Sequence, residues 1–371
     1  MIKLHVIQAE YGDCFILESK LGKDSMNVLI DGGSYQTFKK HLKPTLQKLP
    51  LNGKLDLIIL SHIDNDHIVG LLDLLEEIKT EREKGIKEFI KIAKLWHNSF
   101  SDLFQLDIEP KTLFRNIFLS QNFISREQVE KSKNIVTSII VKGFQQGSDL
   151  TLLAKSLKIT INPGFKKLIL VNDTPKSLRL KHVTFQMLGP TKKNLDKLKK
   201  EWKNWLNKKG RILNSEFELF KILDNSIPNL ASIMFLAEIK NRKLLFTGDG
   251  LGQDIIKVLS QNAMLDKNGK FHVDILKVPH HGSDRNASIE FFDTVYADYY
   301  VISANGRDDN PSPDTLKWII ESNKNSKNSK KIILTNMTPK IKNMLNEYDK
   351  KIFNYQFIVL GKKANFLTIN L

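Results

Sequence analysis

The sequence predicts a layered α/β fold, and three observations support this prediction. Short apolar runs of strand length alternate with segments of helical periodicity, which is the pattern of layered α/β domains. The run Leu55–Leu60 has the character expected of a strand that is buried on both faces. Polar residues directly follow this run and several others, at the strand ends where α/β folds place active sites.

The expected elements follow from these runs. Strands are expected at Lys3–Ile7, Cys14–Glu18, Met26–Ile30, Leu55–Leu60, Ile92–Trp96, Val183–Leu188, Ser232–Ile239, Lys243–Thr247, Val273–Val278, Tyr299–Ser303, Lys331–Thr335, Phe357–Leu360 and Phe366–Ile369. Helices are expected at Tyr35–Leu49, 68–78, Ser125–Val141, Asp149–Leu157, Asn194–Asn207, Gln253–Leu259 and Asp314–Glu321. The stretch of approximately 80–225 has the weakest pattern, and we expect it to form a large, partly helical insertion within a single domain that spans residues 1–371.

Two details of that stretch are open to more than one interpretation. Ser125 followed by Gln128 fits a capping box at a helix start. In the helix expected at Asn194–Asn207, one face carries two leucines together with Trp202 and Trp205. Such an apolar stripe is expected to pack on the core, although the two indole rings could instead stack on bases.

The composition excludes several classes of protein. The chain has 371 residues, of which one is cysteine, so a secreted disulfide framework is excluded. The N-terminus has no apolar core of a signal peptide, and no apolar stretch approaches the roughly 18 residues that suggest a membrane span. We therefore expect a cytoplasmic protein that has no membrane segment.

The basic charge is concentrated in one part of the chain. The chain carries 57 Lys+Arg against 41 Asp+Glu, a net charge of +16, and residues 155–211 alone hold 16 basic and 3 acidic residues, a local excess of +13. A basic segment of this kind can bind phosphate backbones, which makes nucleic acid an expected partner. The alternative is a general abundance of lysine, because only 8 of the 57 basic residues are arginine.

Three of the predicted strand ends carry metal-ligand residues. The first is His62-x-Asp64-x-Asp66-His67, which places four such side chains within six residues. The second is Asp249, and the third is the pair His280-His281. One motif of this kind is weak evidence, but three at strand ends predict a centre for two metal ions with oxygen and nitrogen ligands.

The order HxDxDH, GD and HHGS resembles the metallo-β-lactamase superfamily, and more narrowly the hydrolase domain of ComEC/Rec2-type DNA-uptake proteins. Further matching motifs lie at Gly12-Asp13-Cys14, Leu29–Gly33, Asn229-x-x-Ser232, Leu245–Asp249 and Lys277–Ser283. The resemblance implies a four-layer αββα metallo-β-lactamase sandwich with two divalent metal ions at one edge.

The resemblance also implies a ligand assignment. His62 and Asp64 would bind the first ion, Asp66 and His67 the second, and Asp249 would bridge the two. One histidine of the pair would complete the second site, and His280 is slightly preferred over His281.

Several positions depart from the superfamily pattern. Asp64 stands where a histidine is usual. The histidine of the superfamily's third motif, which lies between the HxDxDH and GD motifs, is missing, and Asn229 and Ser232 lie in that region. ComEC/Rec2-type sequences share these changes. Carboxylate in place of imidazole favours manganese, with zinc or magnesium as alternatives. The HPHP of that family reads Asn310-Pro311-Ser312-Pro313 here, which puts a role for a histidine there in doubt.

Other residues are assigned roles with open alternatives. Asp66 and Asp249 are expected to be catalytic as well as metal ligands. Lys277, Ser283 and whichever histidine is not a ligand, such as His281, are expected to contact the phosphate or leaving group, or else to be ordinary loop residues. Asp31 is either a hydrogen-bond partner of a ligand histidine or a turn residue. Cys14 is expected to pack in the core.

Four functions remain open at the level of sequence. The first is a metal-dependent phosphodiesterase or nuclease that acts on DNA or RNA through a metal-activated water, with a role in defence against foreign DNA as an analogy. The second is a small-molecule phosphoester or thioester hydrolase, and whether Lys166, Lys167, Lys181, Lys192 and Lys193 flank the metals separates it from the first. The third is a binding protein without activity, and the fourth is a subunit regulated by a protein partner through the 80–225 insertion.

Overall fold

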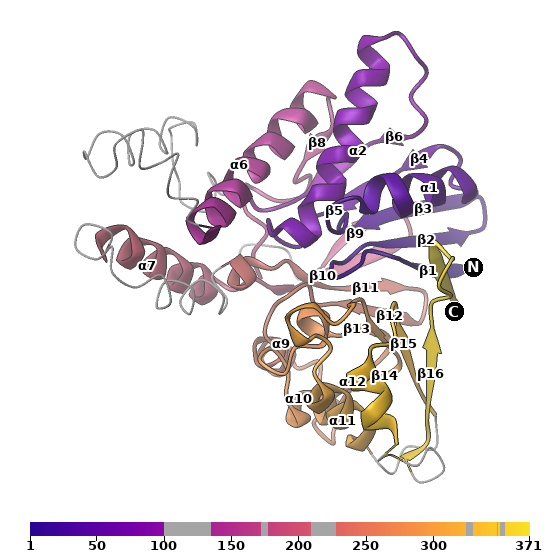
Figure 1. The fold of residues 1–371 in the computed structure, drawn as a ribbon, viewed down its shortest axis with the longest axis vertical. Coiled ribbons are helices and arrows are strands. Elements are labelled where there is room, and N and C mark those ends of the chain that lie inside the picture. The colour runs from indigo at the N-terminus through magenta and orange to yellow at the C-terminus, as the bar shows by residue number, and fades with distance from the viewer. Residues whose placement is uncertain (100–134, 172–176, 209–227, 324–328, 347, 349–352) are drawn as a thin grey trace.

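The computed structural model describes residues 1–99, 135–171, 177–208, 228–323, 329–346, 348 and 353–371, and the side chains of all of these except 135–145, 201–208 and 228. Two β-sheets stack face to face at the centre of the molecule, and helices cover the outer face of each (Figure 1). The predicted αββα sandwich is therefore confirmed.

The first sheet combines an antiparallel half with a parallel half. Its strands lie in the order β17 (Phe366–Asn370), β1 (Ile2–Ile7), β2 (Phe15–Leu21), β3 (Asp24–Ile30), β5 (Leu57–Ile59), β7 (Lys94–Trp96) and β8 (Thr160–Ile161). The strands from β3 to β8 are parallel. The C-terminal strand β17 pairs with β1, so the two ends of the chain lie side by side (Figure 1).

The second sheet is built in the same way. Its order is β16 (Tyr355–Val359), β15 (Lys330–Leu334), β14 (Val295–Ile302), β13 (Phe271–Lys277), β12 (Arg242–Phe246), β11 (Met234–Ile239), β10 (Val183–Gly189) and β9 (Leu178–Leu180). The strands from β12 to β16 are parallel, and those from β9 to β12 are antiparallel.

Helices cover both sheets through apolar faces. The first sheet is covered by α1 (Lys43–Lys48), α2 (Asn65–Glu83) and α6 (Ile135–Ser156). The second is covered by α9 (Gly252–Gln261), α10 (Ile289–Thr294), α11 (Pro313–Glu321) and α12 (Pro339–Leu345). Helix α7 (Lys192–Lys208) projects from the side of the sandwich (Figure 1).

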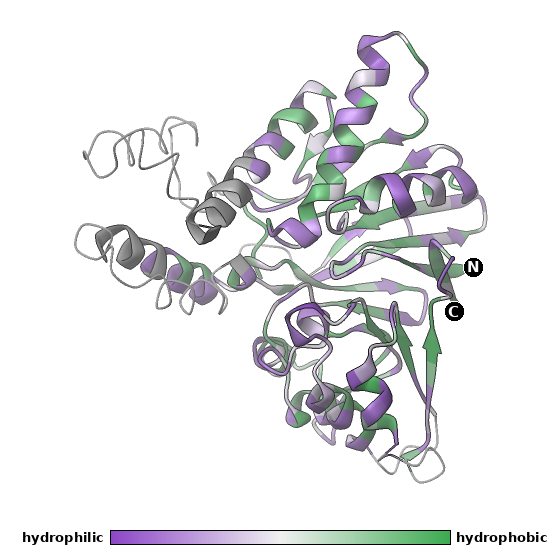
Figure 2. Cartoon of the chain, in the orientation of Figure 1, coloured by the Kyte–Doolittle hydropathy of each residue, from purple (hydrophilic) through white to green (hydrophobic). Residues whose placement is uncertain are grey.

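The main core lies between the two sheets. Phe15 on the first sheet packs against Phe246 on the second, and Phe185 and Phe235 extend this aromatic cluster. Figure 2 shows the same division, since the strands are largely hydrophobic and the outward sides of the helices are hydrophilic. Cys14 is fully buried, as expected of a packing residue.

The stretch 80–225 does not leave the sandwich as one continuous insertion. Its described part supplies β7 and β8 to the first sheet and β9 and β10 to the second. The helices predicted at Ser125–Val141 and Asp149–Leu157 are partly wrong, because α6 is one continuous helix over the described part of that range. Helix α6 passes Gly147 without a break, and there the absent side chain gives Ile63 room to pack. The proposed capping box at Ser125 lies outside the described residues.

Two other sequence predictions need correction. The strand predicted at Leu55–Leu60 divides into β4 (Lys54–Leu55), which pairs with β6 (Lys91–Ile92), and β5. It divides because Asp56 lies within it and accepts a hydrogen bond from the backbone N–H of Asn27 (3.0 Å). The helix predicted at Tyr35–Leu49 begins only at Phe38, as the π-helical turn η1 (Phe38–Leu42) that continues into α1.

The topology brings several polar loops to one edge. The parallel strands of each sheet end at this edge, and hydrogen bonds join the two sheets there: the N–H of Ile233 donates to the carbonyl of Ser61 (2.9 Å), and Ser303 donates to the carbonyl of Gly12 (2.5 Å). Loops that are far apart in the sequence therefore meet. Among the described residues, no helix is both long enough and apolar enough to cross a membrane.

Candidate metal centre

The first ligand loop follows β5 and begins helix α2. Asp31, at the end of β3, accepts hydrogen bonds from the backbone N–H of Ser61 (2.7 Å), from its hydroxyl (2.8 Å) and from Nδ1 of His67 (2.9 Å). Of the two roles left open for Asp31, the structure shows the contact with a histidine. Because Nδ1 of His67 donates its proton to Asp31, the lone pair of Nε2 points into the site.

Close backbone contacts fix this loop against its neighbours. A Cβ atom on Gly12 would lie 2.0 Å from the carbonyl oxygen of Asp66, and one on Gly70 would lie 1.9 Å from that of Gly32. Only glycine allows such approaches. These two glycines therefore hold the loop at 12–13 and the end of β3 directly against the start of α2.

The second and third loops follow the neighbouring strands β12 and β13. Asp249 is 2 % exposed. The pair His280-His281 lies in η3 (Pro279–Gly282), and both histidines have left-handed backbone conformations, with φ of 45° and 53°. Non-glycine residues rarely adopt this conformation, and strain of this kind is concentrated at functional sites.

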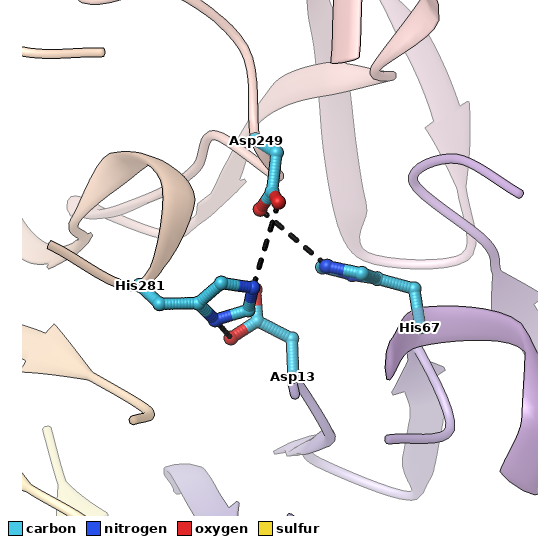
Figure 3. A group of neighbouring side chains, drawn as sticks. All are labelled: Asp13, His67, Asp249 and His281. Carbon is cyan, nitrogen blue, oxygen red and sulfur yellow. Dashed lines mark ion pairs between the residues drawn. The ribbon is translucent and has the colours of Figure 1, made fainter. Parts of the chain in front are cut away.

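Four imidazole groups surround the carboxylate of Asp249. Its oxygens lie 3.4 Å from Nε2 of His67, 3.5 Å from that of His281, 3.5 Å from that of His280 and 3.7 Å from that of His62. Figure 3 shows His67 and His281 directed at Asp249 from two sides. Two aspartates of the first loop complete the group: Asp66 is 3.1 Å from His281, and Asp64 is 3.4 Å from His62.

The spacing and the hydrogen bonding of these atoms fit metal ligands. Two atoms bound to one ion at about 2.0–2.2 Å lie roughly 3–3.5 Å apart, close to the separations seen here. Nε2 of His62, His67 and His281 and one oxygen of Asp249 are buried without a hydrogen-bond partner. Buried polar atoms are rarely left unpaired, so convergent atoms of this kind indicate a site for a cation.

The charges of the site lead to the same conclusion. Five carboxylates lie in or directly against the cluster, against one buried ammonium, Lys277, which leaves a formal charge of −4 when the imidazoles are neutral. The carboxylates are those of Asp13, Asp31, Asp64, Asp66 and Asp249. A buried excess of negative charge is unstable unless cations balance it, and two divalent ions would do so.

The imidazoles show the electrostatic consequence. Burial alone would lower the pKa of His67, but the carboxylates of Asp249 and Asp66 outweigh burial and raise it well above its usual value. The pKa of His281 is raised well above its usual value in the same way, by Asp249 and Asp13 against burial. Burial would raise the pKa of Asp249, but the imidazoles hold it well below its usual range. Protons and metal ions would thus compete for the same nitrogen atoms.

Asp13 is the residue that the sequence analysis did not assign to the site. It is fully buried. Its carboxylate lies 2.5 Å from Nζ of Lys277 and 3.3 Å from Nδ1 of His281. Asp13 is also one of four residues (Figure 3) whose potential ligand atoms lie within 4.8 Å of one another. Nδ1 of His281 donates to the carbonyl of Ser303 (3.0 Å). The carbonyl of Ser303 therefore holds Nδ1 of His281, and Asp13 lies beside it as a buried negative charge. The motif Gly12-Asp13-Cys14 was the available signal.

Lys277 does not have the role expected from the sequence. Its side chain is 1 % exposed, and Nζ also donates to the carbonyl of Gly248 (2.9 Å) and lies 3.6 Å from Asp249. Burial would lower its pKa, but Asp13 and Asp249 raise it. The structure places Lys277 as an internal cation that fixes these two aspartates, rather than as a contact for substrate.

The remaining predicted residues divide between the site and its surroundings. Ser283 lies in the turn after the histidine pair, where its Oγ accepts a hydrogen bond from the N–H of Arg285 (3.3 Å), which is the loop role left open for it. Asn229 lies 3.4 Å from Nδ1 of His280. Lys181 does not flank the site, because it binds the carbonyl of Ser25 and the carboxylate of Asp56 at the opposite end of β3.

Comparison with protein families agrees with the fold. Residues 8–153 match the family model described as "Metallo-beta-lactamase superfamily". This range includes Asp13, Asp31 and the whole of the first ligand loop.

The similarities to individual proteins include the following three. A UPF0223 protein of Lysinibacillus sphaericus (strain C3-41) is 30 % identical over 77 residues, which are 21 % of this chain and 79 % of that protein, and its name states no activity. The metallo-beta-lactamase fold protein YhfI from Bacillus subtilis aligns over 99 % of this chain and 100 % of its own, with 11 % identity and a TM-score of 0.40. A diphosphatase from the PhnP family aligns over 100 % of this chain and 98 % of its own, with the same identity and TM-score. The similarity to these two structures, at 11 % identity and a TM-score of 0.40, gives no information about the reaction that this chain catalyses.

Proposed function

We propose that this chain, which has the metallo-β-lactamase fold of a superfamily of hydrolases, is a two-metal phosphodiesterase that acts on nucleic acid. The observation that carries the proposal is the convergence of buried, unpaired ligand atoms on the carboxylate of Asp249. The narrower resemblance to ComEC/Rec2-type hydrolase domains supports the same reaction and is part of this proposal.

The ligand atoms divide into two halves that share Asp249. We assign His62 and Asp64 to the first half and Asp66 and His67 to the second. When bound, two divalent ions supply a water that ionises near neutral pH and neutralise charge on a phosphate oxygen. The chain supplies the geometry: Asp31 fixes His67, the carbonyl of Ser303 fixes His281, and Lys277 holds Asp13 and Asp249 in their ionised forms.

The donor set favours manganese over zinc. Asp64 provides a carboxylate where the resemblance leads one to expect imidazole, which makes the first half richer in oxygen ligands. Oxygen ligands suit manganese and magnesium, whereas imidazole suits zinc as well as other transition metals. We therefore propose manganese as the activating ion.

The position of α7 supports nucleic acid as the substrate. Leu195 and Leu198 on α7 pack in a small apolar cluster with Leu230 and Leu251, which lie next to the metal loops in the sequence at Asn229 and Asp249. Asn194 also donates a hydrogen bond to Asp254 (2.7 Å). The first turns of α7 are thus attached to the segment at Asn229 and to the start of α9, just after Asp249.

The outward face of the same helix is basic. Lys192, Lys193, Lys197 and Lys200 are exposed, and we call them the α7 lysines. Lys166 and Lys167 are exposed on the segment that leads to Leu168 and Leu170 of the same apolar cluster. Such a basic surface suits an extended polyanion, because each phosphate that is neutralised releases counterions. The side chains of Trp202 and Trp205 lie outside the described residues.

The test is hydrolysis by the purified protein after reconstitution with manganese, magnesium or zinc, each used separately. Plasmid, linear duplex DNA, RNA and a small aryl phosphodiester serve as substrates. We expect cleavage of the aryl phosphodiester and of nucleic acid, with manganese more active than zinc. Failure to cleave any phosphodiester would reject the proposal. Cleavage of the aryl compound but of no nucleic acid would favour a small-molecule hydrolase, and activity with zinc but none with manganese would contradict the choice of metal.

A further inference from the structure

We propose that both histidines of the pair are metal ligands, one in each half of the centre, and that His280 completes the first half while His281 completes the second. This inference rests on the proposed two-metal function and adds which side chain closes which half. It differs from the sequence expectation, in which one histidine of the pair completes the second site and the other contacts substrate.

His281 is placed with the second half by its neighbours. Its Nε2 lies 3.1 Å from Asp66, closer than any other ligand-type atom described around it. Its ring lies 5.2 Å from that of His67 between centroids. Asp66 and His67 are the two ligands that the first loop contributes to the second half, so His281 faces both of them.

His280 is placed with the first half by the oxygen it shares and by the contacts of His281. Nε2 of His280 and Nε2 of His62 lie 3.5 Å and 3.7 Å from the same oxygen of Asp249, Oδ2, whereas His67 faces the other oxygen, Oδ1. Nε2 of His281 also lies 3.5 Å from Oδ2, but His281 contacts Asp66 and His67, and among the described residues no such contact is seen for His280. Of the two histidines, His280 is therefore the one that shares Oδ2 with His62 and is not tied to the second half.

The hydrogen bonds of His280 prepare it as a ligand. Nδ1 donates to the side-chain oxygen of Asn286 (2.8 Å), which leaves the lone pair on Nε2, the atom that faces Asp249. Asn286 in turn donates to the backbone carbonyl of Asp249 (2.8 Å) and is itself buried. One amide thus fixes His280 and the bridging aspartate relative to each other, which is the function of groups that orient metal ligands.

The backbone explains how adjacent residues can serve different halves. Side chains of neighbouring residues normally diverge, but two consecutive left-handed residues turn the chain sharply, and the rings of His280 and His281 end 5.8 Å apart at 72°. Asn229, 3.4 Å from Nδ1 of His280, lies where the resemblance leads one to expect a third-motif histidine. His280 would supply from another strand the imidazole that is missing there.

The test counts bound manganese in combined variants. His280→Ala and His281→Ala should each retain one ion instead of two, measured by elemental analysis after equilibrium dialysis. The spin-coupled Mn–Mn signal in electron paramagnetic resonance should be replaced by that of an isolated ion. His280→Ala combined with Asp66→Ala should lose both ions, whereas His281→Ala combined with Asp66→Ala should still retain one, because these two residues belong to the same half.

His272→Ala is the matched control, because this histidine is exposed on the opposite end of β13 and should leave two ions in place. Thermal unfolding of each variant identifies those that fail to fold, and for these the conservative His280→Asn and His281→Asn variants replace alanine. Two ions retained in His280→Ala, or one retained in its combination with Asp66→Ala, would overturn the inference. A parent protein that binds two coupled ions but cleaves no phosphodiester would reject the proposed function and leave this inference intact.

Discussion

The two halves of the metal centre differ in how firmly the chain holds them. In the second half, the side chains of His67 and His281 are 0 % and 4 % exposed, and both are in contact with a buried carboxylate. In the first half, Asp64 is 36 % exposed and His280 is 25 % exposed. Nδ1 of His280 is held by an amide, not by a carboxylate. Asp66 of the second half is 21 % exposed and His62 of the first half is 0 % exposed, so the first half has two partly exposed side chains where the second has one.

This difference has a consequence for the order of binding. Outer carboxylates fix the tautomer of a ligand histidine and raise its basicity, which strengthens its bond to a metal. We expect the second half to bind its ion more tightly and the first half to exchange its ion more readily.

The largest expected effect comes from the residue that the two halves share. Asp249→Ala removes the carboxylate that faces all four imidazoles, so both halves should lose their ions. We expect the loss of hydrolysis to exceed the roughly 10–100-fold range that is typical of residues behind the ligands. The measurement is turnover of the aryl phosphodiester together with bound manganese.

Asp298→Ala is the control for Asp249→Ala, because Asp298 is a part-exposed partner of His272 outside the centre. Its activity and metal content should equal those of the parent. If Asp249→Ala retained two ions and full turnover, the shared carboxylate would not be a bridge, and the division into two halves would have no basis.

The next effect tests the internal cation beneath the second half. Lys277→Met leaves Asp13 buried without its ammonium partner, and removing one member of a buried ion pair costs about 3–5 kcal/mol. We expect the free energy of unfolding of the metal-free protein to fall by that order. Chemical denaturation of the metal-free protein measures it.

The charge of Lys277 can be separated from its shape. In the variant Asp13→Asn/Lys277→Met both partners are neutral, so it should recover a large part of the stability that Lys277→Met removes. A single variant as stable as the parent would show that the pair contributes nothing, and Lys277 would again be available as a substrate contact.

The sequence predicted which side chains meet at this edge better than it predicted the groups behind them. His62, Asp64, Asp66, His67 and Asp249 could be proposed as ligands because they lie in the loops, and at the helix start, that follow apolar strands, and strand ends of parallel sheets meet at one edge. The alternation of strands with helices predicted a layered α/β fold. The resemblance to the metallo-β-lactamase superfamily, and not the local pattern, implied the αββα sandwich.

Tertiary contacts decided what the sequence could not. Lys277 ends an apolar strand, so its sequence position suggests exposure, but its partner Asp13 lies 264 positions away in the chain. The choice between His280 and His281 depends on two left-handed backbone conformations that non-glycine residues rarely adopt. Asp56 divides a predicted strand because Asn27 and Lys181, both distant in sequence, bind it.

A smaller effect separates the two halves by their supporting groups. Asp31→Asn replaces the carboxylate that holds His67, and we expect manganese affinity in the second half to fall by about 10–100-fold. Asn286→Ala should weaken only the first half, through His280. Titration of the metal-free variants by calorimetry resolves the tighter and the weaker site. Equal loss at both sites in Asp31→Asn would contradict the division into halves.

The smallest effect on the chemical step is expected at the α7 lysines, which lie outside both halves. The triple variant Lys192→Gln/Lys193→Gln/Lys200→Gln removes three exposed charges from α7. Each phosphate that the variant no longer neutralises should reduce the slope of log affinity against log salt by about 0.9 for duplex DNA, so the slope should flatten by up to about 2.7. Turnover of the aryl phosphodiester should equal that of the parent, because the centre is untouched.

The matched control is Lys20→Gln/Lys23→Gln/Lys240→Gln, which removes the same charge from hairpin turns at the opposite end of the strands. If the control flattened the slope as much as the α7 variant did, net charge and not the position of α7 would govern binding. If neither variant changed it, the basic helix would not be the path that nucleic acid takes to the metals.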